Sequence, residues 1–289
     1  MLSVVTTGTI SGLLYGLLGF AVVVLFRMTG IPNFAVGSLA TLGAVIVYVL
    51  AARHHVNLAV AVLTGIAVLA VLATITYLVV MRHHDDAGPL NLTVRTLGLY
   101  LLLFAVTDKV LGEGQPFNFP QLIPAGELRL GPVHVPESGL VVLAIAVLLT
   151  AGFTCLFRYS RVGLLLRGVA ADRDTARLLG AHVRKLEALS WGLTAALAAV
   201  VGILTAPTSL MSADMMDNSL LYVFAGVVIG GLTSLAGAFV GGVTVGLVQG
   251  FAYFYASADV ALLAVFGLFL ATLLIRPHGL FGERALERL

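Results

Sequence analysis

Long apolar runs, separated by short polar stretches, occupy nearly all of the 289 residues. A helical run of about 20 apolar residues crosses the bilayer core, because a helix rises about 1.5 Å per residue. The chain has eight full-length runs of this kind. A further stretch, 220–234, is apolar but short and rich in glycine, which indicates a broken span or a re-entrant segment. The pattern predicts an all-α polytopic membrane protein with eight or nine transmembrane helices, some of them broken, forming a single domain over 1–289. The eight full-length runs are 8–26, 33–52, 56–80, 92–111, 139–157, 188–208, 237–256 and 259–276.

Composition agrees with this pattern. Hydrophobic residues make up 60% of the chain and charged residues 10%, whereas soluble domains carry roughly 25% charged residues. The net charge of +2 does not suggest a nucleic-acid partner, and the single Cys155 excludes a disulfide framework. The first apolar run has no cation before Arg27, so we expect it to be a retained span rather than a signal peptide.

Cations are distributed unevenly between the two predicted sides of the membrane. With residues 158–187 placed in the cytoplasm and 220–234 counted as crossing, thirteen Lys and Arg residues lie inside and three outside. Because cytoplasmic loops carry the excess of Lys and Arg, we expect the N-terminus outside and the C-terminus in the cytoplasm of an inner (plasma) membrane protein.

Two loops are long. The external loop, 112–138, contains "ELRLGPVHV", in which polar and apolar residues alternate around a Gly-Pro turn, and this pattern predicts a small hairpin lid. The cytoplasmic loop, 158–187, carries seven cations against three carboxylates. Charge is therefore concentrated in the cytoplasmic loop.

Residues 172–187 have the pattern of an amphipathic helix. Arg173, Arg177 and Arg184 lie on one stripe, and Ala176, Leu179, Val183 and Leu186 form an apolar stripe. Three interpretations are open: a loop held inside by its charge, a helix lying on anionic lipid, or a helix that docks on a partner protein. Gly180 favours docking, because glycine within a helix costs about 1 kcal/mol relative to alanine and suits a turn between two short helices.

The stretch "DTARLLG", 174–180, resembles the EAA motif of ABC-importer permeases, which forms the cytoplasmic helix that docks on the ATPase. Three further stretches, "FRMTGIPNFAVGSLATLGA", "IGGLTSLAGAFVGG" and "RPHGLFG", are similar to branched-chain amino acid permeases of the LivH/LivM type. Asp174 and Thr175 replace the Glu and first Ala of the motif, while Val36 and Ala236 also depart from the family pattern. The resemblance assigns ATPase coupling to seven residues: Arg173, Asp174, Thr175, Ala176, Arg177, Leu179 and Gly180.

The resemblance implies the permease subunit of an ABC importer for branched-chain or related small hydrophobic amino acids. Its implied partners are two ATPase subunits, a second permease subunit (a paralogue or a second copy) and an extracytoplasmic solute-binding protein. ATP would be bound by the partners, since the chain has no GxxxxGK[ST] motif. We expect no catalytic residues, no metal and no cofactor of its own. A permease for urea or short amides, an ion-coupled secondary transporter and a lipid-bound scaffold remain alternatives.

Two breaks within the apolar runs mark a candidate pathway. They are 29–38 and 230–242, where Gly or Pro interrupts the helix, and such breaks are tolerated in a membrane beside a cavity or packed protein. The predicted pathway residues are Asn33, Ser38, Gly231, Thr233 and Ser234. No carboxylate or lysine lies deep in a span, which argues against a proton relay and therefore against the secondary transporter.

Overall fold

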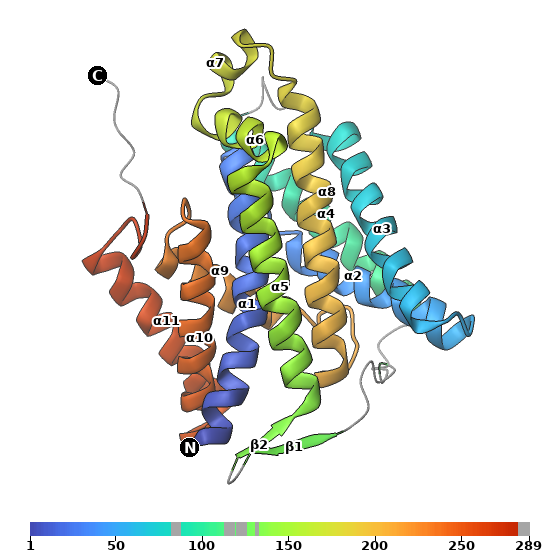
Figure 1. The fold of residues 1–289 in the computed structure, drawn as a ribbon, viewed down its shortest axis with the longest axis vertical. Helices are drawn as coiled ribbons and strands as arrows, with labels where there is room; N and C mark the ends of the chain where they lie inside the picture. The colour runs from blue at the N-terminus through green and yellow to red at the C-terminus, as the bar shows by residue number, and fades with distance from the viewer. Residues whose placement is uncertain (82–87, 113–118, 120–125, 131–132, 283–289) are drawn as a thin grey trace. The chain divides into compact units, whose positions relative to one another are not determined.

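The computed structural model describes residues 1–81, 88–112, 119, 126–130 and 133–282. These residues form helices and one short hairpin (Figure 1). In chain order the elements are α1 (Leu2–Thr29), α2 (Val36–Tyr48), η1 (Val49–Arg53), α3 (Leu58–Thr76), η2 (Tyr77–Met81), α4 (Pro89–Leu111), β1 (Glu127–Leu130), β2 (Val133–Pro136), α5 (Glu137–Tyr159), α6 (Arg161–Ala171), α7 (Arg173–Leu178), α8 (Val183–Thr205), η3 (Ala206–Thr208), α9 (Asp217–Gly230), α10 (Leu235–Tyr255) and α11 (Ala258–Ile275).

Eight of the described helices are long and apolar enough to cross a membrane, and they coincide with the eight predicted runs. The all-helical polytopic fold is therefore confirmed. Two of these helices, α2 and α3, end in the π-helical turns η1 and η2. Side-chain and backbone caps mark several helix starts, as at Asn57, whose side chain accepts a hydrogen bond from the Ala59 amide.

The ninth apolar stretch forms a short helix. α9 has 14 residues, so it is about 21 Å long at about 1.5 Å per residue, less than the bilayer core of about 30 Å. It runs antiparallel to α10, because Gly226 approaches Gly242 while Gly230 approaches Gly237 across the connecting turn. This arrangement fits both alternatives predicted for the stretch, a broken span or a re-entrant segment.

The chain divides into two compact units. One contains Met1–Val23, Ile123–Val147 and Asn218–Leu289, and the other contains Val24–Leu122 and Leu148–Asp217. Helices α1 and α5 each contribute residues to both units. The single domain expected over residues 1–289 stays a prediction.

The first unit packs its helices through glycine. A Cβ added to Gly12 of α1 would lie 2.7 Å from the Cα of Val243, and one added to Gly226 of α9 would lie 3.0 Å from the Cα of Gly242. Helix backbones that approach so closely leave no room for a side chain, and small residues at such contacts let membrane helices associate by van der Waals packing. Both α1 and α9 therefore pack directly on α10.

The C-terminal segment of this unit completes the end of α9. Its Leu280 amide donates to the Ile229 carbonyl at 2.8 Å, and the Phe281 amide donates to the Gly230 carbonyl at 3.0 Å. The last carbonyls of a helix have no partner within the helix, so a remote segment satisfies them here. The two late family-like stretches of the sequence thus contact each other.

The second unit is built on α2, α3 and α8, which pack against one another. A Cβ added to Gly43 of α2 would lie 2.8 Å from the Cα of Ala199 in α8, so these two helices also meet closely. One apolar cluster includes Val45, Ala61 and Ile203. A second cluster, called here the inner cluster, consists of Leu25, Tyr77, Met81, Ala188 and Trp191.

The predicted hairpin is confirmed. Strands β1 and β2 pair antiparallel, with Leu128 opposite Val135 and Leu130 opposite Val133. The Gly-Pro turn at 131–132 lies outside the described residues. The role of the hairpin as a lid stays a prediction.

Candidate functional site

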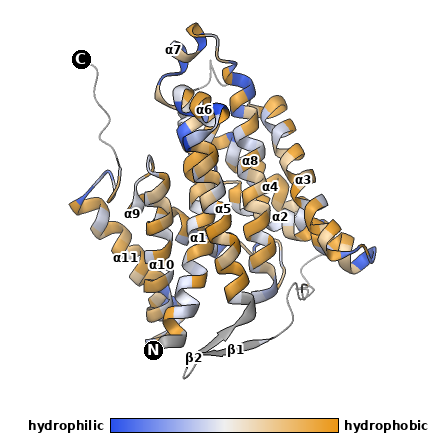
Figure 2. Ribbon diagram, viewed as in Figure 1, coloured by the Kyte–Doolittle hydropathy of each residue, from blue (hydrophilic) through white to orange (hydrophobic). Residues whose placement is uncertain are grey.

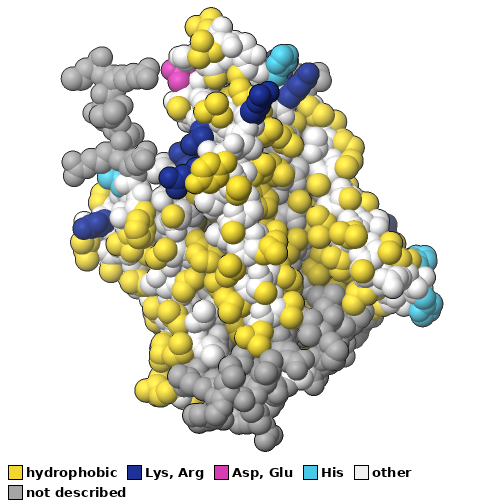
Figure 3. Space-filling view, in the orientation of Figure 1, with side chains coloured by type: hydrophobic (Ala, Val, Ile, Leu, Met, Phe, Trp, Pro, Cys, Tyr) yellow, Lys and Arg dark blue, Asp and Glu magenta, His cyan; other side chains and the backbone are white. Residues whose placement is uncertain are grey.

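The polar segment of the second unit consists of α6, α7 and the start of α8. Figure 2 shows hydrophilic residues on α6 and α7, whereas the long helices are mainly hydrophobic. In Figure 3, Lys and Arg side chains gather around the same segment. Ser160 caps the start of α6, where its hydroxyl accepts a hydrogen bond from the Gly163 amide at 2.9 Å. The concentration of charge predicted for residues 158–187 is therefore visible on the surface.

A side-chain cap starts α7. The Asp172 carboxylate accepts hydrogen bonds from the amides of Asp174 and Thr175, each at 3.0 Å, and from the Thr175 hydroxyl at 2.9 Å. A carboxylate at this position satisfies helix amides that have no partner and also complements the positive end of the helix. Thr175, a residue of the EAA-like stretch, thus stabilises the start of α7.

A left-handed turn ends α7. Gly180 has φ +86°, its amide donates to the Arg177 carbonyl at 3.0 Å, and the Ala181 amide donates to the Ala176 carbonyl at 2.9 Å. This pair of hydrogen bonds is the Schellman motif, which favours glycine at its left-handed position. The turn predicted at Gly180 is confirmed.

The apolar stripe expected along 172–187 does not form one face, and that expectation is wrong. Because the chain turns at Gly180, α7 and α8 are separate helices. Ala176, Val183 and Leu186 are buried within the protein, whereas Leu179 is 83% exposed. Its neighbour Leu178, which was not part of the stripe, is 88% exposed. The exposed apolar surface of residues 172–187 is therefore the Leu178–Leu179 tip.

The expected arginine stripe is also divided. Arg184 lies on α8 beyond the turn, while Arg177 lies 3.7 Å from the exposed carboxylate of Asp174. Arg173 forms an ion pair with Glu187, whose side chain is only 1% exposed. Glu187 also accepts a hydrogen bond from the hydroxyl of the buried Tyr77. One arginine of the three thus faces the protein interior.

Next to the turn lies a basic cavity. It has a volume of about 500 Å³ and is lined by Arg177, His182, Val183, Arg184 and Lys185. Cations on both sides of the turn converge there, which favours carboxylates of a partner at this place.

The two pathway residues predicted in the second unit are both buried. Asn33 and Ser38 are each 2% exposed. The Asn33 Oδ1 accepts a hydrogen bond from the Ala35 amide at 2.9 Å, but the Asn33 Nδ2 and the Ser38 Oγ have no hydrogen-bond partner among the described residues. Buried polar atoms usually have a partner. Each of these two atoms can therefore still form a hydrogen bond with a polar group that reaches the start of α2.

The three pathway residues predicted in the first unit have different surroundings. Gly231 has φ +108° and contacts the C-terminal segment, since an added Cβ would lie 2.6 Å from the Gly282 amide nitrogen. The Ser234 hydroxyl caps α10 by accepting from the Gly237 amide at 3.0 Å. Thr233 lies exposed in the turn between them. Gly231 and Ser234 thus have structural roles that do not depend on a pathway.

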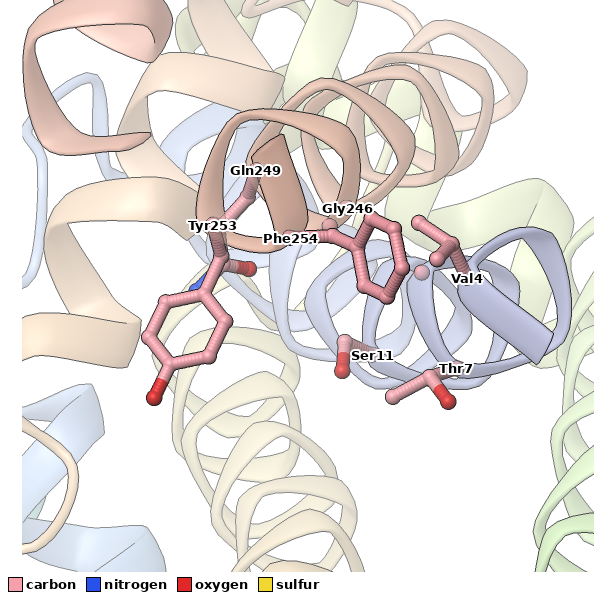
Figure 4. A pocket seen from close by; sticks show the side chains of 9 residues that line it. Val4, Thr7, Ser11, Gly246, Gln249, Tyr253 and Phe254 are labelled. Atoms are coloured by element: carbon pink, nitrogen blue, oxygen red, sulfur yellow. The ribbon is translucent and has the colours of Figure 1, made fainter. Parts of the chain in front are cut away.

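A cavity of about 340 Å³ lies between α1 and α10 (Figure 4). It is lined by glycines of both helices and by the apolar side chains of Val4 and Phe254. Thr7, Ser11 and Gln249 add polar groups, and the Gln249 Oε1 accepts a hydrogen bond from the Tyr15 hydroxyl at 2.9 Å. The sequence prediction did not include this cavity, although the four-residue spacing of Gly8, Gly12 and Gly16 is typical of a helix-packing face.

Asp217, the first residue of α9, has a raised pKa. Asp217 accepts a hydrogen bond from the Tyr100 hydroxyl at 2.8 Å. Burial raises the pKa of Asp217 above its ordinary value, the hydrogen bond from Tyr100 opposes this rise, and the nearby Asp214 adds to it. The contact joins the first residue of α9 to Tyr100 of α4.

A family comparison identifies the chain. The family described as "Branched-chain amino acid transport system / permease component" matches residues 4–275. The chain belongs to this permease family. The resemblance found in the four sequence stretches is therefore confirmed over most of the chain.

Two similar proteins are named as members of this kind of permease, and one solved structure shares the fold. The probable branched-chain amino acid transport permease protein LivH of Methanocaldococcus jannaschii is 28% identical, covering 92% of this chain and 88% of the relative. The high-affinity branched-chain amino acid transport system permease protein LivH of Salmonella typhimurium is 23% identical, covering 97% and 95%. A chain of PsaBC from Streptococcus pneumoniae in complex with Fab has the same fold, with a TM-score of 0.55, 12% identity and coverage of 94% and 91%.

This permease is accordingly a multi-pass membrane protein and the transmembrane component of an ABC importer, while ATP binding and hydrolysis belong to separate subunits. Sequence reasoning missed Asp172, Leu178 and Glu187 of its polar segment, and also Tyr77 of η2, which contacts Glu187. Asp172 had a local signal, because an Asp just before a run of helix formers is typical of a helix cap. The positions of Tyr77 and Glu187 had none, since they depend on packing between helices.

Proposed function

We propose that this permease translocates branched-chain or related small hydrophobic amino acids, which it receives from an extracytoplasmic solute-binding protein. Two ATPase subunits dock on the cytoplasmic side, and a second permease subunit, a paralogue or a second copy, completes the pore. The family match and the named substrates of the relatives support the substrate class.

The observation that carries the coupling role is the capped helix α7. Its two ends are held by Asp172 and by the Gly180 turn, and its tip presents Leu178 and Leu179 to solvent beside a basic cavity. Exposed apolar side chains ringed by charge are typical of a protein-docking surface. We therefore assign ATPase docking to this tip, with Asp174 and Arg177 at its rim.

The proposed pathway passes the start of α2. Asn33 and Ser38 are the candidates there, because each has a buried polar atom that no described part of the chain pairs with. Gly231, Thr233 and Ser234 stay in the proposal as residues of a turn whose shape the pathway requires. The cation distribution supports an N-terminus outside and a C-terminus in the cytoplasm.

Reconstituted transport tests the proposal. The permease is placed in proteoliposomes with the ATPase and permease subunits of its transport system, and the binding protein is loaded with radiolabelled leucine. We expect uptake that needs ATP, persists with a protonophore, and is competed by isoleucine and valine but not by urea or acetamide. Uptake that needs no ATP and stops with the protonophore would identify a secondary transporter. Competition by urea or acetamide alone would reassign the substrate.

A further inference from the structure

A fully buried carboxylate lies where α7 meets the transmembrane helices. Glu187, in the second turn of α8, has no exposed surface. It accepts hydrogen bonds from the guanidinium of Arg173, the first residue of α7, and from the hydroxyl of Tyr77, the first residue of η2. One carboxylate of α8 therefore contacts the neighbouring α7 and also η2, which lies 110 residues away along the chain.

Such a contact is hard to break. A carboxylate taken out of water is stabilised only while its cation and hydrogen-bond donors stay in place, and removal of one partner leaves a buried charge uncompensated. Hydrogen bonds that involve ionised groups are also stronger than those between neutral groups. The three side chains are thus expected to move together.

Short connections join α7 to the helices on either side of it. Asp172, in an extended conformation, joins α7 to α6, and the turn at 179–182 joins α7 to α8. The tip of α7 is largely exposed. α7 contacts α6 and α8, and the buried Ala176 and the Arg173 guanidinium, which pairs with Glu187, help to anchor it to the unit.

Tyr77 connects the carboxylate to the inner cluster. Its ring centroid lies 6.2 Å from that of Trp191, and both rings pack with Leu25, Met81 and Ala188. η2 is a π-helical turn at the end of α3, and such turns are frequent at functional sites and provide an alternative local geometry.

We propose that Arg173, Glu187 and Tyr77 form a clamp through which displacement of α7 is transmitted to α8 and to the end of α3. This inference rests on the proposed docking of ATPase subunits at α7. Within the clamp, Glu187 is the positioning residue: it fixes α7 through Arg173 and moves η2 through Tyr77. The Leu178–Leu179 tip, by contrast, binds the partner, and the clamp passes the resulting displacement of α7 on to α8 and η2.

The test measures movement of η2 in the assembled importer. A fluorescent bimane label is attached to a cysteine at Val79, an exposed residue of η2, in a Cys155→Ser background. The emission is compared between the nucleotide-free complex and the complex trapped with ATP and vanadate. We expect an emission shift on trapping in the parent, and Tyr77→Phe and Glu187→Gln to reduce this shift about 5-fold or more while the ATPase still copurifies and hydrolyses ATP.

The matched control is Tyr159→Phe. Tyr159 ends α5 and is 75% exposed, and the guanidinium of Arg158 lies over its ring at 5.7 Å; we expect the full emission shift in this variant. Tyr77→Phe keeps the ring that packs on Trp191, so it tests the hydroxyl even where Glu187→Gln fails to fold. A full shift in Tyr77→Phe, an equal loss in Tyr159→Phe, or loss of the ATPase from Tyr77→Phe would each overturn the clamp. A parent chain that retains no ATPase would instead overturn the proposed function and the clamp with it.

Discussion

Backbone conformation, rather than space, requires glycine at residue 180. A Cβ added there would meet no atom within 4 Å, yet the φ of +86° is one that residues with a side chain rarely adopt. A left-handed conformation costs residues with a Cβ about 1–2 kcal/mol, and Asn is the best tolerated of them. The choice of residue at position 180 is therefore restricted by the backbone conformation and not by the space around the side chain.

We expect Gly180→Val to uncouple the importer and Gly180→Asn to leave it close to normal. Strain of about 1.4 kcal/mol shifts an equilibrium about tenfold, so valine should lower the population of the docked tip by about that factor. Retention of the ATPase on a tagged permease and ATP-dependent uptake are the measurements. Equal loss in both variants would assign the effect to bulk at this position, and normal coupling in the valine variant would reduce α7 to a tether held inside by its charge.

At the scale of elements, α9 depends on the C-terminal segment. Gly231 leaves the helix with φ +108°, and the segment that follows α11 donates hydrogen bonds to the last carbonyls of α9. A side chain at Gly231 would overlap Gly282, so the segment would have to leave. The short helix would then end with unsatisfied carbonyls.

We expect Gly231→Leu to abolish uptake and to lower the thermal stability of the protein in detergent, while the protein still inserts into the membrane. Insertion depends on the hydropathy of the spans, which this change leaves unaltered. Gly267→Leu is the matched control, because an added Cβ at Gly267 of α11 meets no atom within 4 Å. Quantitative membrane fractionation and a thermal-shift assay separate insertion from stability. Unchanged stability together with lost uptake would place Gly231 in the pathway itself.

At the scale of the whole molecule, orientation is the property to test. We expect a cysteine at Leu178, which is highly exposed, to react with an impermeant maleimide only after the cells are permeabilised. A cysteine at His54, in the exposed turn between α2 and α3, should react in intact cells. Both variants carry Cys155→Ser, and the cysteine-free parent is the control. Labelling of the Leu178 cysteine from outside would invert the orientation.

Several properties were determined by the sequence alone. The eight spans follow from the length of apolar runs, the turn at residue 180 from one glycine among helix formers, and the hairpin from alternation around Gly-Pro. Each depends on residues close together in the chain, where the period of polar and apolar positions and the local backbone preference already decide the outcome.

Only the tertiary structure decided which side chains of the polar segment are buried and which residues they pair with. A continuous apolar stripe and an arginine stripe were expected along 172–187, but three of the four apolar residues are buried and Arg173 pairs with Glu187. Likewise, Gly231 contacts a segment some fifty residues away, and Tyr77 reaches Glu187 across a separation of 110 residues. A helical pattern shows which residues share a face but not which neighbour covers that face. That choice depends on packing between helices that are distant along the chain, and on the need to pair every buried charge.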